Sequence, residues 1–129
     1  MFATADSLLT WKEWIAILTR NFDLDVELLH RREYRRYDVV DGIANVTFES
    51  VPDGEVLPGP TSMTMIDVSP TGFMARDFIE YPRETVASVE LIFADVQRRA
   101  RARVMHSTPT LGGFKVGFEL IFEDGPDRH

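Results

Sequence analysis

The stretch FKVGFELIF, residues 114–122, is the most regular part of the sequence and decides the fold class. Its hydrophobic side chains occupy every second position: Phe114, Val116, Phe118, Leu120 and Phe122. Because successive side chains of a β-strand point to opposite faces, this period of two predicts a strand with one buried face. The stretch therefore favours a mainly β protein.

Further strands are predicted upstream at short intervals. They are ANVTFE (44–49), TSMTMIDV (61–68), FMARDF (73–78), ASVELIFADV (87–96) and RARARV (99–104). Turn-forming stretches separate them, among them the proline- and glycine-rich residues 50–60. Five or six short strands with turns between them predict an antiparallel barrel or sandwich, and a barrel also removes exposed strand edges.

The N-terminal part carries a helical pattern. Residues 10–21 are predicted as a helix because Thr10 and Glu13 have the spacing of a capping box. The hydrophobic positions i, i+3, i+4 and i+7 are Trp11, Trp14, Ile15 and Leu18. We expect this stripe to pack on the domain, and docking of a partner or a second copy is the alternative, because tryptophan is enriched at interface anchors.

The segment FDLDVEL, residues 22–28, supports two interpretations. Its hydrophobic and acidic residues alternate strictly, which favours a half-buried strand. Asp25 is also a good N-cap, so a short helix that begins there is the alternative. We favour the extended conformation.

Composition and charge exclude several classes of protein. The 129 residues suit one domain, and 44% hydrophobic with 27% charged residues are typical of a soluble globular chain. The net charge of −7 argues against affinity for duplex DNA, which needs a basic face. The start MFATADS lacks the features of a signal peptide, and residues 7–21 are too short and too charged to span a membrane. We expect a cytoplasmic protein.

Four of the twelve arginines lie in RREYRR, residues 31–36, which we call the arginine segment. They are Arg31, Arg32, Arg35 and Arg36. A guanidinium group is a planar fork that binds phosphate oxygens two at a time, and it also matches the O6 and N7 edge of guanine. The segment suggests a guanine nucleotide as ligand. Without a second motif, we would favour a solvated charge run paired with nearby acidic residues.

The segment DVSPTG, residues 67–72, supplies such a motif, and we call it the motif turn. Asp67 is an acceptor-only carboxylate that complements the N–H donors at N1 and N2 of guanine. Ser69 adds a small hydroxyl, and Gly72 permits a positive φ or a close backbone approach to a ligand. Taken alone, these residues are ordinary turn formers.

Together, the two segments resemble the PilZ domain family, whose members carry R-x-x-x-R and, further along, D/N-x-S-x-x-G. Arg32 and Arg36 fit the first element. Asp67, Ser69 and Gly72 fit the second without substitution. The resemblance implies a six-stranded antiparallel β-barrel that binds the bacterial second messenger cyclic di-GMP.

Two registers of the arginine segment satisfy R-x-x-x-R, because Arg31 and Arg35 have the same spacing as Arg32 and Arg36. We prefer the second pair because a strand is predicted directly after Arg36. In that register, Arg31 is the additional arginine often seen beside the motif, and Arg35 is a possible further contact.

The resemblance covers residues 31–122, since the ending VGFELIF is similar to the closing strand of the family. Residues 1–30 then form an N-terminal extension with the helix, and residues 123–129 a loose C-terminal tail. The extension departs from the simplest family members and leaves the downstream partner open.

The resemblance also implies roles for the site residues. Arg32 and Arg36 would contact phosphate and guanine. Asp67 and Ser69 would bind a guanine edge, and Gly72 would keep the turn tight. Family members often bind a stacked dimer of the ligand, in which an additional arginine clamps a base, and Arg31 is the natural candidate.

The function expected is that of a non-enzymatic sensor that reports the second-messenger level to a protein partner. The partner would meet the N-terminal helix or the barrel rim once the ligand has ordered the arginine segment. Motility, pilus function and exopolysaccharide synthesis are typical processes of the family, and a homodimer is compatible with it. No cofactor is expected besides the ligand.

Other function classes compete with this expectation. A PilZ-like scaffold that binds only protein is disfavoured by the intact motifs. A small barrel that binds single-stranded RNA through arginines and aromatics is disfavoured by the acidic total. An enzyme is least expected, because no nucleophile or acid–base pair follows from the spacing, and Ser69 lies in no G-x-S-x-G elbow.

The remaining basic and metal-binding residue types have simpler interpretations. RRARAR, residues 98–103, is predicted as the wet face of a strand with arginines guarding an edge. Alternatively, Arg101 or Arg103 adds positive potential near the ligand. No metal site is expected, because the histidines lack ligand-like spacing: His30, His106 and His129.

Overall fold

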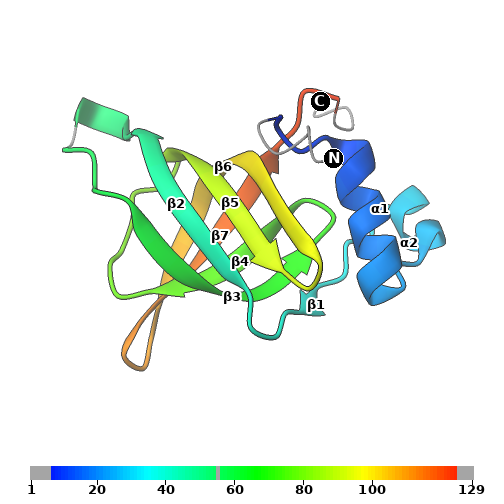
Figure 1. The fold of residues 1–129 in the computed structure, drawn as a ribbon. Coiled ribbons are helices and arrows are strands. Elements are labelled where there is room, and N and C mark those ends of the chain that lie inside the picture. Colours follow the sequence, from blue (N-terminus) through cyan, green and yellow to red (C-terminus); the bar gives the residue numbers. More distant parts are fainter. Residues whose placement is uncertain (1–6, 55, 125–129) are drawn as a thin grey trace.

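The computed structural model describes residues 7–54 and 56–124, where two helices precede seven strands. The elements are α1 (Trp11–Phe22), α2 (Val26–His30), β1 (Tyr37–Asp38), β2 (Ile43–Ser50), β3 (Thr61–Ser69), β4 (Gly72–Asp77), β5 (Val86–Phe93), β6 (Val96–Thr110) and β7 (Gly113–Ile121), with a single 3₁₀ turn, η2 (Pro52–Gly54), before β3. Figure 1 shows the helices beside one end of the sheet.

Six of the strands close into an antiparallel barrel, which confirms the expected fold. The neighbours follow the order β3, β2, β5, β6, β7 and β4, and β4 pairs back with β3 to close the ring. Strand β1 is an additional short strand that pairs with β3. Closure leaves the six barrel strands without an open edge.

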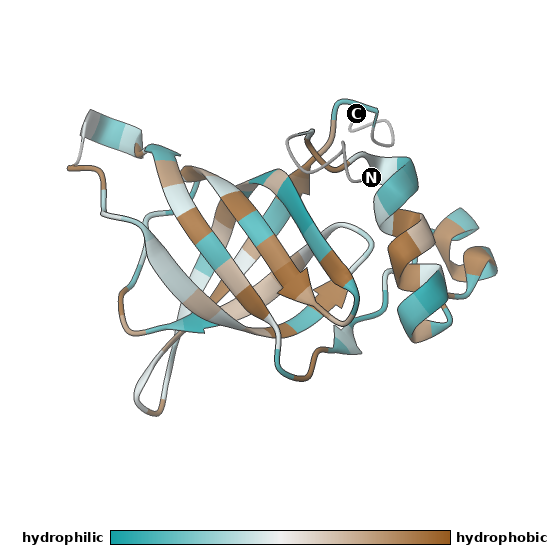
Figure 2. Ribbon diagram, in the orientation of Figure 1, coloured by the Kyte–Doolittle hydropathy of each residue, from teal (hydrophilic) through white to brown (hydrophobic). Residues whose placement is uncertain are grey.

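Alternating side chains fill the barrel. In β5, every second residue is at most 2% exposed: Ala87, Val89, Leu91 and Phe93. The residues between them are only partly buried. Figure 2 shows hydrophobic and hydrophilic positions alternating along the strands, as expected where one face of each strand packs inward.

Helix α1 packs on the barrel through the stripe predicted from the sequence. The capping box at its start is formed, because Glu13 N donates to Thr10 Oγ1 and Thr10 N donates to the Glu13 carboxylate. Trp14 and Leu18 are fully buried, and the Trp14 ring meets Phe93 edge-on with ring centroids 6.0 Å apart. The buried residues of this stripe therefore pack on the barrel, as expected. Neither of the two described helices is long and apolar enough to cross a membrane.

The extended conformation favoured for residues 22–28 is wrong, and the alternative is correct. Asp25 is the N-cap of α2, and its carboxylate accepts a hydrogen bond from Glu27 N at 2.9 Å. Leu28 is buried while Val26 is 50% exposed, although strict alternation would put them on one face. A period of two over seven residues does not distinguish a strand from a short helix when a strong cap is present.

Arg99 and Arg101 of β6 lie on the wet face, as predicted, but Arg98 is mostly buried against Glu13, and the arginines of β6 do not guard an edge. Strand β6 pairs with β5 on one side and with β7 on the other, so it is an interior strand of the barrel. Arg99 and Arg101 are exposed, and Arg101 forms an ion pair with Glu49 at 3.0 Å. Pairs at this exposure contribute little stability.

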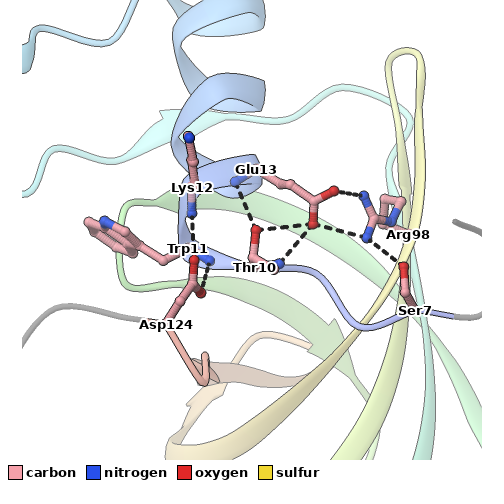
Figure 3. Close-up of polar contacts among 7 residues, drawn as sticks. All are labelled: Ser7, Thr10, Trp11, Lys12, Glu13, Arg98 and Asp124. Atoms are coloured by element: carbon pink, nitrogen blue, oxygen red, sulfur yellow. Dashed lines mark hydrogen bonds and ion pairs between the residues drawn. The ribbon is translucent and has the colours of Figure 1, made fainter.

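The first part of the C-terminal tail contacts helix α1. The Asp124 carboxylate accepts hydrogen bonds from Trp11 N at 2.7 Å and Lys12 N at 3.5 Å (Figure 3). A negative charge is favourable there because the N-terminus of a helix is the positive end of its dipole. Residues 125–129 of the tail lie outside the described residues.

Candidate functional site

The motif turn is the hairpin connection between β3 and β4. Ser69 pairs with Gly72, so Pro70 and Thr71 form a two-residue loop. Thr71 N donates to Ser69 Oγ at 3.3 Å, and Thr71 O accepts from Leu120 N of β7 at 2.9 Å. The turn is therefore bonded both within itself and to a neighbouring strand.

Gly72 is the residue that lets β4 approach β7. A Cβ atom at this position would overlap the carbonyl oxygen of Phe118. The φ angle of Gly72 is not positive. Of the two reasons given for a glycine here, a positive φ does not apply, and the close backbone approach that the structure shows is to β7.

A β-bulge decides where Asp67 points. In strict alternation, Asp67 would share the inward face with Met63 and Met65, which are 1% and 2% exposed. The register between β3 and β4 shifts between Met65 and Asp67, and Val68 is the next fully buried residue. Because a bulge changes the phase of alternation, the Asp67 side chain points to the outside of the barrel.

A second bulge moves His106 in the same way. Ala102 and Val104 are buried, so strict alternation would bring His106 inward. The register between β6 and β7 shifts between Val104 and His106, and His106 is exposed. Its ring lies over Gly117, where a Cβ atom would overlap the imidazole.

The two bulges border a cleft of about 190 Å³, which we call the turn cleft. Its walls include Arg36, Asp67, Ser69, Gly72, His106 and Glu119. Four of these residues come from the two sequence motifs. Segments that are far apart in the sequence thus contribute to one surface depression.

The pairing of β1 with β3 brings Arg36 to this cleft. Tyr37 pairs with Val68, and Asp38 pairs with Asp67. The same antiparallel register places Arg36, the residue before β1, opposite Ser69. The arginine segment therefore enters the sheet beside the motif turn.

Asp67 is partly desolvated in the turn cleft. Burial raises the pKa of Asp67 above its ordinary value, and the nearby Asp38 carboxylate raises the pKa further. The cations Arg36 and Lys115 act in the opposite direction and lower it. A half-buried carboxylate with this balance is a strong acceptor for N–H donors of a ligand.

Arg32 follows α2 in a strained backbone conformation. Its φ is 58°, and its N–H donates to Leu29 O at 3.0 Å while Glu33 N–H donates to Leu28 O at 2.8 Å. These two bonds form a Schellman cap, in which glycine is the usual residue. A side chain in the left-handed region costs roughly 1–2 kcal/mol. Strain of this kind is often found at binding sites.

Arg32 lines a second cleft of about 620 Å³, which lies between the N-terminal extension and the barrel and which we call the helix cleft. Tyr34 lines it from the arginine segment, and Arg103 and Glu119 line it from β6 and β7. Thr71 and Glu119 line both clefts, so the two depressions adjoin.

The remaining arginines of the segment lie apart from the clefts. Arg31 forms an ion pair with Glu33, with 3.3 Å between Nε and Oε2, and lines neither cleft. Arg35 is exposed and also lines neither. The structure brings Arg32 and Arg36 to the two clefts, which is the register preferred from the sequence.

Helix α1 contacts the motif turn directly. Trp14 Nε1 donates to Ser69 O at 2.9 Å. The start of the helix is anchored to β6, where Arg98 donates to both Glu13 carboxylate oxygens, at 2.8 and 3.1 Å (Figure 3). These bonds with Arg98 lower the pKa of Glu13 to about 2. The extension is therefore fixed to the strands that carry the site.

The residues of the clefts that the sequence analysis missed include Thr71, His106 and Glu119. Thr71 is a variable position of the second motif, and nothing in the motif singles it out. Glu119 could have been found, because it occupies an outward position of the alternating stretch 114–122. His106 depends on the bulge in β6, for which the sequence gives no signal.

Comparison with protein-family models finds no match, and comparison with curated proteins finds no relative. Among residues 7–54 and 56–124, no three histidine, aspartate or glutamate side chains gather in a way that would hold a metal ion.

Proposed function

We propose that the chain is a non-enzymatic sensor module that binds cyclic di-GMP and reports it to a protein partner. One observation carries this proposal: Arg36 lines the same cleft as the three motif residues Asp67, Ser69 and Gly72. These are residues on which the resemblance to the PilZ family depends, and the resemblance implies that they meet at one ligand site.

The chemistry of the two clefts suits this ligand. Cyclic di-GMP carries two phosphates and two guanines. Arg32 and Arg36 provide bidentate donors for phosphate oxygens or for the O6 and N7 edge of guanine. Asp67 provides the acceptor that the N1 and N2 donors of guanine require. The helix cleft, of about 620 Å³, is in the size range of ligand sites, and the smaller turn cleft, of about 190 Å³, adjoins it.

The output would pass through helix α1. A ligand that contacts Ser69 acts on the residue whose carbonyl group accepts the Trp14 hydrogen bond. A change in this bond would alter how α1 meets the barrel, provided that the ligand binds the two arrangements with different affinity. A cytoplasmic location and a partner that recognises α1 or the barrel rim belong to the same proposal.

The test is calorimetric titration of the purified chain with cyclic di-GMP. Arg36→Ala should weaken binding about tenfold to a hundredfold, because a charge-assisted contact contributes roughly 1.5–3 kcal/mol. Arg35→Ala is the matched control. Arg35 is the neighbour of Arg36, carries the same charge, and has a side chain that lines neither cleft. It should change the affinity by no more than about twofold, because exposed charges are screened by salt.

The absence of heat with the wild-type chain would reject the proposal and leave a scaffold that binds only protein. Equal losses in Arg35→Ala and Arg36→Ala would also contradict it, because the segment would then act only through its total charge.

A further inference from the structure

The side chains that line the helix cleft are of the kind that binds a nucleobase. Its apolar lining consists of Trp11, Leu29, Leu120 and Phe122. Tyr34 adds an aromatic ring that is 38% exposed. Aromatic side chains stack on any base, because every base has a π-face. The walls therefore suit a base, and selection among bases must come from polar groups.

Glu119 is a polar group that lines the helix cleft and the turn cleft alike. It lies on β7, where it pairs with Gly72 of β4 on one side and with Arg103 of β6 on the other. Its Oε1 accepts a hydrogen bond from Arg103 Nη2 at 2.9 Å, and its side chain is 37% exposed. A carboxylate has two oxygens with about four acceptor sites, so this bond leaves capacity for a ligand.

Arg103 holds Glu119 in place. Its Nε lies 3.5 Å from Glu84 Oε1, so the guanidinium group is fixed between two carboxylates. A guanidinium fork that is held on both sides restricts the rotation of its partners. Arg103 thus acts as a positioning residue for Glu119.

We infer that the helix cleft receives the second guanine of cyclic di-GMP and that Glu119 selects it by accepting hydrogen bonds from N1 and N2. Asp67 has the same role for the first guanine in the turn cleft, so two carboxylates match the two bases. Adenine has an acceptor at N1 and no amino group at C2, so it would face Glu119 with a lone pair. Since this inference rests on the proposed function, its test must separate the two.

The N-terminal extension gains a binding role from this assignment. Trp11 and Leu29 belong to the extension, and they supply apolar walls of the helix cleft. The barrel strands alone would present Glu119 and Arg103 on an open face. The extension is therefore part of the ligand site as well as a surface for a partner.

The experiment compares cyclic di-GMP with cyclic GMP-AMP, which carries one guanine and one adenine, by calorimetry. The wild-type chain should bind cyclic di-GMP about tenfold to a hundredfold more tightly, because the adenine leaves Glu119 without donors. Glu119→Gln should bind cyclic di-GMP about tenfold more weakly and lose or reverse the preference, because an amide carries N–H donors beside its acceptor oxygen, which suits adenine.

Glu84→Gln is the matched control. It removes the same charge from the other partner of Arg103, and Glu84 lines neither cleft. It should keep the preference for cyclic di-GMP. Thermal unfolding of both variants checks that the barrel is intact.

The outcomes separate the two proposals. If the wild-type chain binds cyclic di-GMP and Arg36→Ala weakens it, while Glu119→Gln keeps the wild-type preference, the second-guanine assignment is wrong and the proposed function stands. If the wild-type chain binds neither dinucleotide, both are wrong.

Discussion

The motif turn and the arginine segment contribute to the same site, but they are held in place very differently. The motif turn is bonded to β7 through Thr71, and its Ser69 carbonyl accepts from the buried Trp14. All six residues of 31–36 are exposed. The turn is thus held by bonds to its neighbours, whereas the arginine side chains are exposed and would lose freedom on binding the proposed ligand.

This difference assigns separate tasks to the two regions. A rigid carboxylate on a preformed turn provides discrimination between ligands, because its geometry does not adjust to the wrong base. Exposed arginines attract an anion but lose side-chain freedom when they bind it, at a cost of about 0.5–1.5 kcal/mol each. Changes to the turn should therefore affect folding, and changes to the arginines should affect binding.

Gly72→Ala should have the largest effect on stability. The added Cβ would overlap the Phe118 carbonyl group, and this backbone cannot rotate away. We expect the free energy of unfolding to fall by about 3 kcal/mol, measured by chemical denaturation. Gly59→Ala is the control, since a Cβ at Gly59 meets nothing within 4 Å. Similar losses in both variants would show that the turn is no more constrained than the loop.

Arg32→Gly should sharpen the comparison by moving stability and binding in opposite directions. Glycine removes the strain of a side chain at φ 58°, so the chain should become more stable by about 1 kcal/mol. Cyclic di-GMP binding should weaken about tenfold, because a charged contact is lost. Arg35→Gly, where φ is not positive, should not be stabilising. A destabilised Arg32→Gly variant would contradict the strain argument.

Glu13→Gln should have the smallest effect, and that effect should depend on pH. The pKa of Glu13 is lowered from 4.5 to about 2 by its bonds with Arg98. A depressed pKa means that the carboxylate stabilises the fold fully above about pH 4.5 and loses this contribution as the pH falls toward 2. Glutamine keeps a capping acceptor but not the charge. The difference in unfolding free energy between wild type and variant should be constant near neutral pH and shrink in acid. A difference that does not change with pH would exclude the ion pair as its source.

The sequence predicted most of the fold because its strands obey the period of two. The stretch 114–122 corresponds to β7, and the segment 87–96 contains β5 as far as Phe93, after which a turn leads into β6 at Val96. The capping box at Thr10 formed as expected.

Helix α2 was only the alternative to a strand in the sequence analysis. The N-cap Asp25 favours a helix more strongly than seven residues of alternation favour a strand. The sequence predicted β6 at an edge of the sheet, but β6 is an interior strand. The charges on one face of a strand do not indicate which strands pair with it on either side.

The candidate site could be predicted only in part. The motifs identified Arg36, Asp67 and Ser69 as site residues. The period of two along the strand, however, predicts that Asp67 points into the barrel with Met63 and Met65. A bulge is a property of two paired strands, so no single segment encodes it. The alternation of 114–122 identifies Glu119 as an outward residue, but its neighbours Gly72 on β4 and Arg103 on β6 follow only from closure of the barrel.

The position of helix α1 has a practical consequence. The chain contains two tryptophans, Trp11 and Trp14. Trp11 lines the helix cleft, and Trp14 is bonded to the Ser69 carbonyl beside the turn cleft. All tryptophan fluorescence of the protein therefore originates next to the turn cleft or the helix cleft. Two single Trp→Phe variants would let the intrinsic fluorescence report ligand binding in each cleft separately.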